Sequence, residues 1–423
     1  MTSARGRKPS ARTARRTVTR TPSAPEVVVL GGGLSKFSAE RPDGTPIDWI
    51  VEATQAALAD AGLEPAAIEH SVVAYESEII ARQLTMGQVV QDAVGLTPKP
   101  SVRVEAGGGT GGAALRTAFA YLRGGLCQSL LVVGADAVGR QVPSTTVRQV
   151  YAMSGDVDFE MAAGGFFSAY YALMMREHMR RYGTTEEQFA RVSVKNHRNA
   201  LSNPLAAMPL TLTIEDVMAS PLVAAPYKRL DCAVLADGAA ALILATPRWA
   251  REHDRAFRNR PRVYFTGSGC GTDRMRLGDR PQPYPGLAHF RAKREAAAMA
   301  YAMAGVRHPR RELDVAEVAD PYTGVELQSY EDLGFCKYGE SGPLTERGVF
   351  DLGGELPTNT SGGLIGQGAP PGAMGLAQAV EILRQLRGEC PKARQVKNAR
   401  RGLADIHGGT ASLAVVSIFE RRD

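Results

Sequence analysis

The sequence predicts a layered α/β protein with two similar αβαβα halves and a helical segment inserted in the first. Short apolar segments of strand length alternate with segments whose apolar residues recur every three or four positions, the period of an amphipathic helix. Ser129–Gly134 is almost wholly apolar, which is typical of a central strand buried on both faces. The same strand and helix order recurs in the second half. This alternation favours helices packed on sheets, and 423 residues provide enough chain for both halves.

The first half is expected to start with a buried strand at Val27–Leu30 and a tight turn at the three glycines that follow. Residues 47–62 have helical apolar spacing and end on a glycine, which predicts an amphipathic helix. The chain should then form strands at Ser71–Tyr75, Ser101–Glu105 and Ala239–Ala245, a helix from about Gly112 to Arg123, and a helical insertion over residues 165–231.

The second half is expected to follow a junction rich in proline and arginine near residues 246–262. Its predicted strands are Val263–Gly267, Val315–Val318 and Leu413–Phe419, and its predicted helices are 286–304 and 372–387. The predicted organisation is therefore a tail at 1–24, a first half at 25–250 with a helical loop domain at about 150–231, and a second half at 260–423.

The charge of the chain is concentrated in its first residues. Residues 1–24 hold seven basic and no acidic residues, so subtracting seven from the formal +6 leaves −1 for residues 25–423. A nearly neutral body gives no charge argument for binding nucleic acid or a membrane. The tail is rich in Arg, Ser, Thr and Pro and is expected to be disordered. We interpret it as a dispensable extension rather than an organellar targeting peptide of similar composition.

The five cysteines are scattered without metal-ligand spacing, so we expect no bound metal and a reducing, cytoplasmic location. No apolar run reaches membrane-spanning length, and no secretory signal is visible.

Residues 101–117 read Ser-Val-Arg-Val-Glu-Ala-Gly-Gly-Gly-Thr-Gly-Gly-Ala-Ala-Leu-Arg-Thr. This segment resembles the nucleophile segment of thiolases of the sterol-carrier-protein and archaeal types, usually Val-Glu-Ala-Ala-Cys-Ala-Ser-Gly-Gly. Residues 182–204 resemble the loop-domain helix of that family, and residues 226–241 resemble its Asp-Gly-Ala-Ala-Ala strand entry. The resemblance covers most of residues 25–420 and implies the five-layered thiolase fold.

The resemblance also implies that the catalytic side chains of the family are missing. Gly108 stands where the nucleophilic cysteine belongs, and glycine cannot form an acyl-enzyme thioester. Residues 315–323 resemble the Glu-Leu-His-Asp-Cys-Phe pattern with Ala319 in place of its histidine, and residues 362–375 resemble the Gly-His-Pro segment with Ala369 in place of the activating histidine. Aldolases of the lipid-transfer-protein type resemble this chain in lacking the cysteine, but they place tyrosines at both histidine positions.

Three residues remain as candidates for proton transfer. His407 lies in the segment that resembles the last active-site loop, beside a double glycine, and equally suits a loop histidine that caps backbone carbonyls. Tyr322 suits either a phenolic acid or base or an aromatic wall residue, and Asp320 suits either catalysis or structural hydrogen bonding. In thiolases the glycine-rich loops line the pantetheine tunnel, which implies substrate binding by Gly108, Gly109, Gly362, Gly363, Gly368, Gly408 and Gly409.

The leading hypothesis is an enzyme that makes or breaks a C–C bond on a coenzyme A or carrier-protein thioester by an aldol-type route, with no tightly bound cofactor. Amides at the glycine-rich helix start after Glu105 would polarise the thioester carbonyl. The alternatives are a catalytically degenerate subunit that supports an active partner, and an acyl-CoA binding protein. Aromatic residues at 166–171 suggest a roomy pocket or an ordinary packing stripe.

The family resemblance implies association with another chain. We expect a homodimer whose two-fold interface involves Ser129–Gly134 and the segment after Gly108, or a heteromer with a zinc-ribbon/OB-fold protein or an active thiolase homologue. The sequence has no zinc motif of its own, so a zinc-ribbon partner would be a separate chain.

Overall fold

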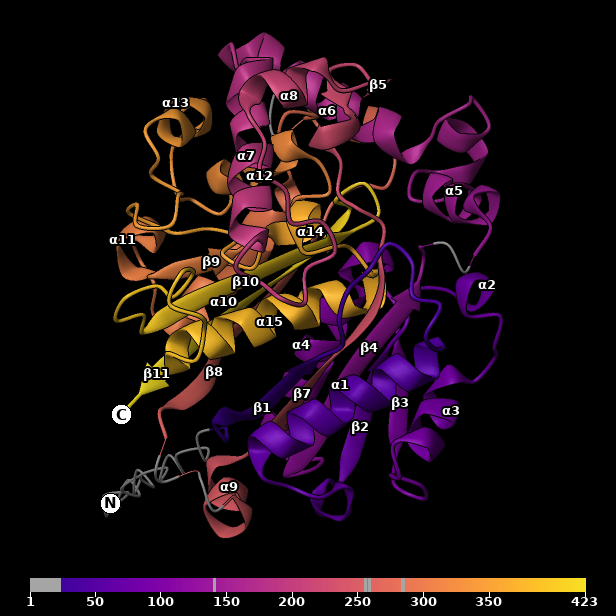
Figure 1. Ribbon diagram of the computed structural model, residues 1–423, viewed down its shortest axis with the longest axis vertical. Helices are drawn as coiled ribbons and strands as arrows, with labels where there is room; N and C mark the ends of the chain where they lie inside the picture. Colours follow the sequence, from indigo (N-terminus) through magenta and orange to yellow (C-terminus); the bar gives the residue numbers. More distant parts are fainter. Residues whose placement is uncertain (1–23, 140–141, 255–256, 258–259, 283–285) are drawn as a thin grey trace, which may run out of the picture.

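The computed structural model describes residues 24–423 except 140–141, 255–256, 258–259 and 283–285 (Figure 1). The tail predicted at residues 1–24 therefore lies outside the described part, apart from its last residue. The strands are β1 (Val27–Leu34), β2 (His70–Ala74), β3 (Ser101–Val104), β4 (Ser129–Ala137), β5 (Leu222–Ala224), β6 (Tyr227–Lys228), β7 (Asp237–Ala245), β8 (Arg262–Thr272), β9 (Val315–Glu317), β10 (Arg401–Gly408) and β11 (Leu413–Arg422). The α-helices are α1 (Pro46–Ala61), α2 (Glu78–Ala81), α3 (Met86–Ala93), α4 (Thr110–Arg123), α5 (Ser144–Ala152), α6 (Phe167–Tyr182), α7 (Glu186–Ala200), α8 (Ile214–Ala219), α9 (Pro247–His253), α10 (Arg291–Ala304), α11 (Pro309–Glu312), α12 (Thr323–Asp332), α13 (Ser341–Glu346), α14 (Gly363–Gly366) and α15 (Pro371–Arg387).

The central sheet repeats one strand pattern twice. Its order is β3-β2-β4-β7-β1-β8-β11-β10-β9. In the first half β2 pairs parallel with β4, and β7 pairs antiparallel with both β4 and β1. In the second half β9 pairs parallel with β10, and β11 pairs antiparallel with both β10 and β8. The two halves are therefore structurally equivalent, with β1, β2, β4 and β7 corresponding to β8, β9, β10 and β11. They join where Val27–Val29 pairs with Val263–Phe265.

Helices complete the five predicted layers. Alternate residues of β7 face opposite sides, so Leu242 packs with α4 and α15 between the two halves, while Ile243 packs with α1 on the outer face. Helix α10 covers the outer face of the second half, where Ala296 packs with Val416. Figure 1 shows α1 across the strands of the first half and α15 between the halves. The predicted fold class is confirmed.

Strand β1 corrects one expectation. The expected tight turn at Gly31–Gly33 is wrong, because β1 continues as a strand to Leu34. A Cβ built on Gly33 would lie 2.1 Å from Ala53 O, and one built on Gly31 would lie 2.3 Å from Ala57 O. The glycines therefore let α1 pack directly against the strand backbone. The helix itself matches its prediction and ends at Gly62, which has a φ of 66°.

Strand β10 corrects a second expectation. The segment that was expected to be a loop around His407 is the end of a strand paired with both β9 and β11. Within the described chain, no helix has the length and apolar character needed to cross a lipid bilayer.

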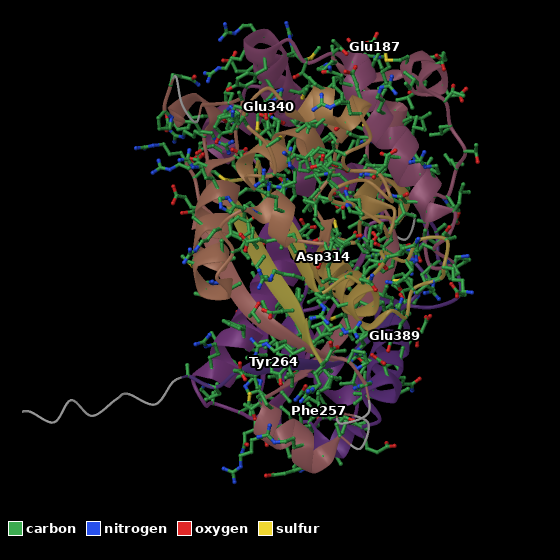
Figure 2. The ribbon with its side chains drawn as sticks, turned by 90° about the vertical axis from the view of Figure 1, so that its left-hand side faces the viewer. Glu187, Phe257, Tyr264, Asp314, Glu340 and Glu389 are labelled. Carbon is green, nitrogen blue, oxygen red and sulfur yellow. The ribbon has the colours of Figure 1, made fainter. Side chains whose placement is uncertain are left out.

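The inserted helices form one end of the molecule. Helices α6, α7 and α8 lie above the sheet in Figure 1, with the short β5–β6 hairpin beside them. Figure 2 places Glu187 and Glu340 at this helical end and Tyr264 and Phe257 at the opposite end. The buried side chains of α6 and α7 pack with α12, so the insertion is held by the second half as well as the first. This arrangement brings the insertion over the ends of the central strands.

Candidate functional site

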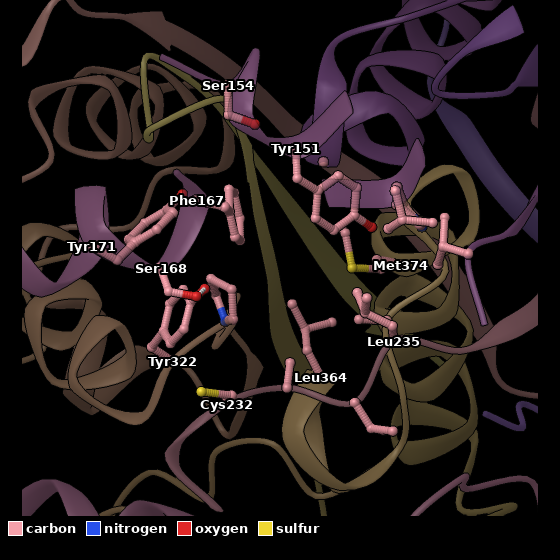
Figure 3. A pocket seen from close by; sticks show the side chains of 18 of the residues that line it. Tyr151, Ser154, Phe167, Ser168, Tyr171, Cys232, Leu235, Tyr322, Leu364 and Met374 are labelled. Carbon is pink, nitrogen blue, oxygen red and sulfur yellow. Dashed lines mark hydrogen bonds between the residues drawn. The ribbon is translucent and has the colours of Figure 1, made fainter. Parts of the chain in front are cut away.

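A cavity of about 750 Å³ lies between the insertion and the ends of β2, β9 and β10. Figure 3 shows Tyr171, Ser168 and Tyr322 on one side of it, and Tyr151, Met374 and Leu235 on the other. Helix α5 supplies Tyr151, helix α6 supplies Tyr171, and Tyr322 directly precedes α12, while the starts of α14 and α15 supply Leu364 and Met374. Residues from both halves and from the insertion therefore share one site.

The three positions at which the family resemblance predicts missing catalytic side chains meet in this cavity. Gly108, Ala319 and Ala369 all line it. A Cβ built on Gly108 would lie 3.0 Å from His407 O and 3.5 Å from the Met374 methyl group. Ala319 and Ala369 belong to a small apolar cluster with Leu364, Met374, Ile406 and Val415. The wall beside Gly108 is therefore apolar on this side.

His407 lies at the end of β10, and Nε2 of its imidazole is 2.9 Å from the Tyr171 hydroxyl oxygen. That hydroxyl donates its single proton to Gly409 O at 2.9 Å. The hydroxyl must therefore accept from His407, which makes Nε2 the protonated nitrogen and leaves the lone pair on Nδ1. Among the residues that the structure describes, Nδ1 has no hydrogen-bond partner. The interpretation of His407 as a loop histidine that caps carbonyls is therefore wrong.

The surroundings of His407 keep its imidazole neutral. Burial lowers the pKa of His407 well below its usual value, and the nearby Lys293 and Arg280 charges lower it further. Burial likewise raises the pKa of Tyr171 above its usual range. The His407–Tyr171 pair is thus an uncharged unit with one free lone pair, the form in which an imidazole accepts a proton.

Tyr322 lines the cavity but is held as a wall residue. Its hydroxyl lies 2.8 Å from Ser168 Oγ, and its ring stacks on Tyr227 with 4.8 Å between centroids. Burial raises the pKa of Tyr322 well above that of a free phenol, so its hydroxyl stays protonated. Phe166, Phe167 and Tyr171 also line the cavity, as an aromatic pocket requires. Tyr170 instead donates to Ala152 O at 3.2 Å.

Asp320 is fully buried and does not line the cavity. Its carboxylate accepts hydrogen bonds from Asn196 Nδ2 at 2.7 Å and from Leu364 N at 2.6 Å. It therefore holds the start of α14, as the structural interpretation of this residue required. Burial, followed by the nearby Glu326, raises the pKa of Asp320 well above its usual range.

The glycines divide into two groups. Gly108 and Gly409 line the cavity, whereas the other five candidates for substrate binding do not: Gly109, Gly362, Gly363, Gly368 and Gly408. Gly408 is needed for packing, because a Cβ there would lie 1.9 Å from Ala106 O. The expected amide donors are partly occupied, since Gly107 N donates to Glu105 Oε1 at 2.5 Å and Gly109 N donates to Ala106 O at 3.0 Å.

Glu76, Tyr151 and Cys232 are among the side chains of the cavity that were not predicted from the sequence. Glu76 follows the apolar strand β2, and an acidic residue at the end of a buried strand was the available signal. Cys232 is not an activated thiol. Its thiol donates to Lys228 O at 3.2 Å, and burial raises the pKa of Cys232 to about 12.

Comparisons with known proteins identify the family. Residues 28–220 match the model "Thiolase, N-terminal domain" and residues 282–421 match "Thiolase C-terminal domain-like". The chain belongs to the thiolase family. It is 38% identical over 397 residues to the acetyl-CoA acetyltransferase of Methanothermobacter thermautotrophicus, covering 94% of this chain and 100% of that one. It is 31% identical over 407 residues to sterol carrier protein 2 of Bos taurus, covering 93% of this chain and 72% of that protein.

Solved structures share the fold. The structure of an Ltp2–ChsH2(DUF35) aldolase matches with a TM-score of 0.78 and 24% identity, covering 93% of this chain and 97% of that one. A monomeric SCP2-thiolase-like protein type 1 from Mycobacterium smegmatis matches with a TM-score of 0.71 and 18% identity, covering 93% and 77%.

Proposed function

We propose that this protein makes or breaks a C–C bond in a coenzyme A or carrier-protein thioester by an aldol-type route that needs no acyl-cysteine. The observation that carries the proposal is the neutral His407–Tyr171 pair in a cavity where Gly108 offers no nucleophile. Such a cavity keeps a proton acceptor without the means to form an acyl-enzyme. Relatives named acetyl-CoA acetyltransferase support a coenzyme A thioester as the substrate class.

In the cleavage direction the substrate is a β-hydroxyacyl thioester. Nδ1 of His407 takes the hydroxyl proton, the Cα–Cβ bond breaks, and the β-carbon becomes the carbonyl of an aldehyde or ketone. The electron pair of the broken bond passes into the thioester enolate, which a proton at Cα converts to the shortened acyl thioester. The neutral imidazole is in the accepting form across the neutral pH range, because burial lowers the pKa of His407.

One observation favours a second candidate, a degenerate subunit that supports an active partner. Ala319 and Ala369 lie in an apolar cluster, so this wall of the cavity offers no polar group to a thioester oxygen. Acyl-CoA binding without catalysis would fit the same wall. Both alternatives predict binding without turnover.

We also propose that the active form includes a second, separate chain. The match to an aldolase named for two components, Ltp2 and ChsH2(DUF35), supports this proposal. The zinc-ribbon/OB-fold class is the partner that the family resemblance implies.

The test is mass spectrometry of the products formed from a panel of β-hydroxyacyl-CoA and β-ketoacyl-CoA thioesters, with and without a candidate partner. His407→Gln is the test variant. His253→Gln is the matched control, because His253 lies on α9 and does not line the cavity. We expect chain-shortened acyl-CoA together with an aldehyde or ketone, reduced about 100-fold or more in His407→Gln and unchanged in the control. Equal turnover by His407→Gln would remove His407 from the mechanism. Binding of the thioesters without turnover would favour the non-catalytic alternatives.

A further inference from the structure

The cavity holds a second side chain suited to proton transfer, Glu76. It lies in the first half at the position equivalent to that of Ala319 in the second half. Glu76 is the second residue after β2, and Ala319 is the second residue after β9. Strands β2 and β9 are equivalent in the two halves, so Glu76 occupies in the first half the place that Ala319 occupies in the second. Both residues line the cavity. At these equivalent positions, the second half therefore has the apolar side chain of Ala319 and the first half has the carboxyl group of Glu76.

The Glu76 side chain is built into the wall. The residue is partly buried, and its backbone N–H lies 3.4 Å from Asp136 Oδ2. Its Oε2 is buried and makes no hydrogen bond within the described ranges of the chain. A buried, unpaired carboxyl oxygen is costly and needs an explanation in ligand binding or chemistry. His407, 5% exposed and with Nδ1 also unpaired within those ranges, is a second such group in the same cavity.

Charged and titratable groups face Glu76 from the three neighbouring elements. They are Asp136 on β4, Glu105 after β3, and Tyr151 on α5. Burial, then the two carboxyl neighbours, raises the pKa of Glu76 well above its usual range. Burial raises the pKa of Asp136 to about 8, although Gly372 N donates to it at 2.6 Å. The Arg103 charge acts in the opposite sense and lowers the pKa of Asp136, and its guanidinium donates to Tyr75 O at 2.8 Å.

We propose that Glu76 is the catalytic residue that delivers a proton to, or removes one from, the α-carbon of the thioester. The inference rests on the proposed function, in which cleavage leaves an enolate that must be protonated. In that direction the Glu76 carboxylic acid gives its proton to Cα and becomes a carboxylate, while His407 holds the proton of the substrate hydroxyl. Proton exchange with water then returns both groups to their starting state, so the reaction gains and loses no proton. In the synthetic direction the Glu76 carboxylate removes the α-proton, and the enolate attacks the carbonyl.

The test separates the role of Glu76 from the C–C bond chemistry. Propionyl-CoA has α-protons and no β-hydroxyl, so the protein can exchange its α-protons in D2O without making or breaking a C–C bond. Deuterium at Cα is followed by mass spectrometry in wild type, Glu76→Gln and the control Glu64→Gln, whose exposed side chain does not line the cavity. We expect Glu76→Gln to slow exchange about 100-fold or more and Glu64→Gln to retain it. Exchange needs the carboxylate and should rise with pH, whereas cleavage needs the acid and should fall.

A second readout does not require the correct acyl group. The infrared difference spectrum between wild type and Glu76→Gln at pH 7 should contain the C=O stretch of a neutral carboxylic acid. An infrared difference spectrum that contains only carboxylate bands would overturn the proposal. In the exchange experiment, α-proton exchange that is equal in Glu76→Gln and wild type, or that is absent from wild type, would also overturn it. Exchange that depends on Glu76 without cleavage of any β-hydroxyacyl-CoA would support Glu76 and count against the proposed function alone.

Discussion

One hydroxyl fixes the protonation pattern of the cavity. Tyr171 receives the His407 Nε2 proton and gives its own to Gly409 O, both at 2.9 Å. The tautomer of His407 therefore depends on a residue of the insertion, while His407 itself comes from the second half. The insertion therefore contributes to the hydrogen bonding of His407 as well as to the wall of the cavity.

Tyr171→Phe should therefore destabilise the protein and change the tautomer of His407. The variant leaves a buried imidazole N–H and the Gly409 carbonyl unpaired, which costs about 1–3 kcal/mol in the free energy of unfolding. Urea unfolding measures the loss, and nitrogen NMR of the histidine rings at pH 7 measures the tautomer. Tyr170→Phe is the control, since that hydroxyl bonds to Ala152 O and does not line the cavity. A wild-type ring protonated at Nδ1 would contradict the assignment.

The sequence predicted some site residues and missed others for physical reasons. Gly108 and Ala319 stand in family motifs, so their meeting could be expected before the structure. Glu76 lies in no such motif, and its importance comes from its unpaired oxygen and its acidic neighbours, which only the folded chain brings together. Asp320 lies within a motif but points into the protein, where α14 binds it.

At the scale of elements, close packing explains why strand β10 was not predicted from the spacing of apolar residues. The polar and glycine residues of β10 interrupt its apolar pattern, so no strand was predicted there. Each of these residues has its own contact in the fold. Lys293 on α10 donates to Asp405 at 2.5 Å. Gly402 leaves room for α15, since a Cβ there would lie 2.6 Å from an Ile382 methyl group. Segments with regular apolar spacing, such as α1 and β4, were predicted to within a few residues.

Gly33→Ala tests the contact between α1 and β1. The added methyl would lie 2.1 Å from Ala53 O, so the helix must move away from the strand. Overpacking of this kind costs about 1–3 kcal/mol in the free energy of unfolding, measured in urea. Gly278→Ala is the control, because a Cβ there meets no atom of the described residues within 4 Å, and we expect a change within about 0.5 kcal/mol. Equal stability of the two variants would show that α1 is not in close contact with the backbone of β1 at Gly33.

At the scale of the whole molecule, the sheet has two end strands, β3 and β9, and the residues of β9 are all buried. Every residue of β4 is buried, and the strand is paired with β2 and β7 along both edges. It is therefore not available for the two-fold contact that the sequence suggested for Ser129–Gly134. Strand β3 lies at the end of the sheet, and its residues are partly buried. A dimer remains a prediction, and β3 is the strand edge that it would use.

Arg387 connects the two halves through the core. It ends α15 in the second half, and its guanidinium reaches Asp60 at 2.9 Å and Leu30 O at 2.8 Å in the first half. The side chain is 1% exposed, so water does not replace these contacts. Together with the β1–β8 pairing, this connection predicts that both halves unfold in a single transition.

Arg387→Met should lower the stability of the whole molecule and keep that transition single. Removing the cation takes one partner from Asp60, which still pairs with Arg260, and one from each of two β1 carbonyls, a loss of about 1–3 kcal/mol in the free energy of unfolding. Differential scanning calorimetry gives both the midpoint and the number of transitions. Arg384→Met, one turn earlier on α15 and partly exposed, should shift the midpoint much less. Two separate transitions in wild type would mean that the halves fold independently, and an unchanged midpoint in Arg387→Met would mean that the arginine does not hold them together.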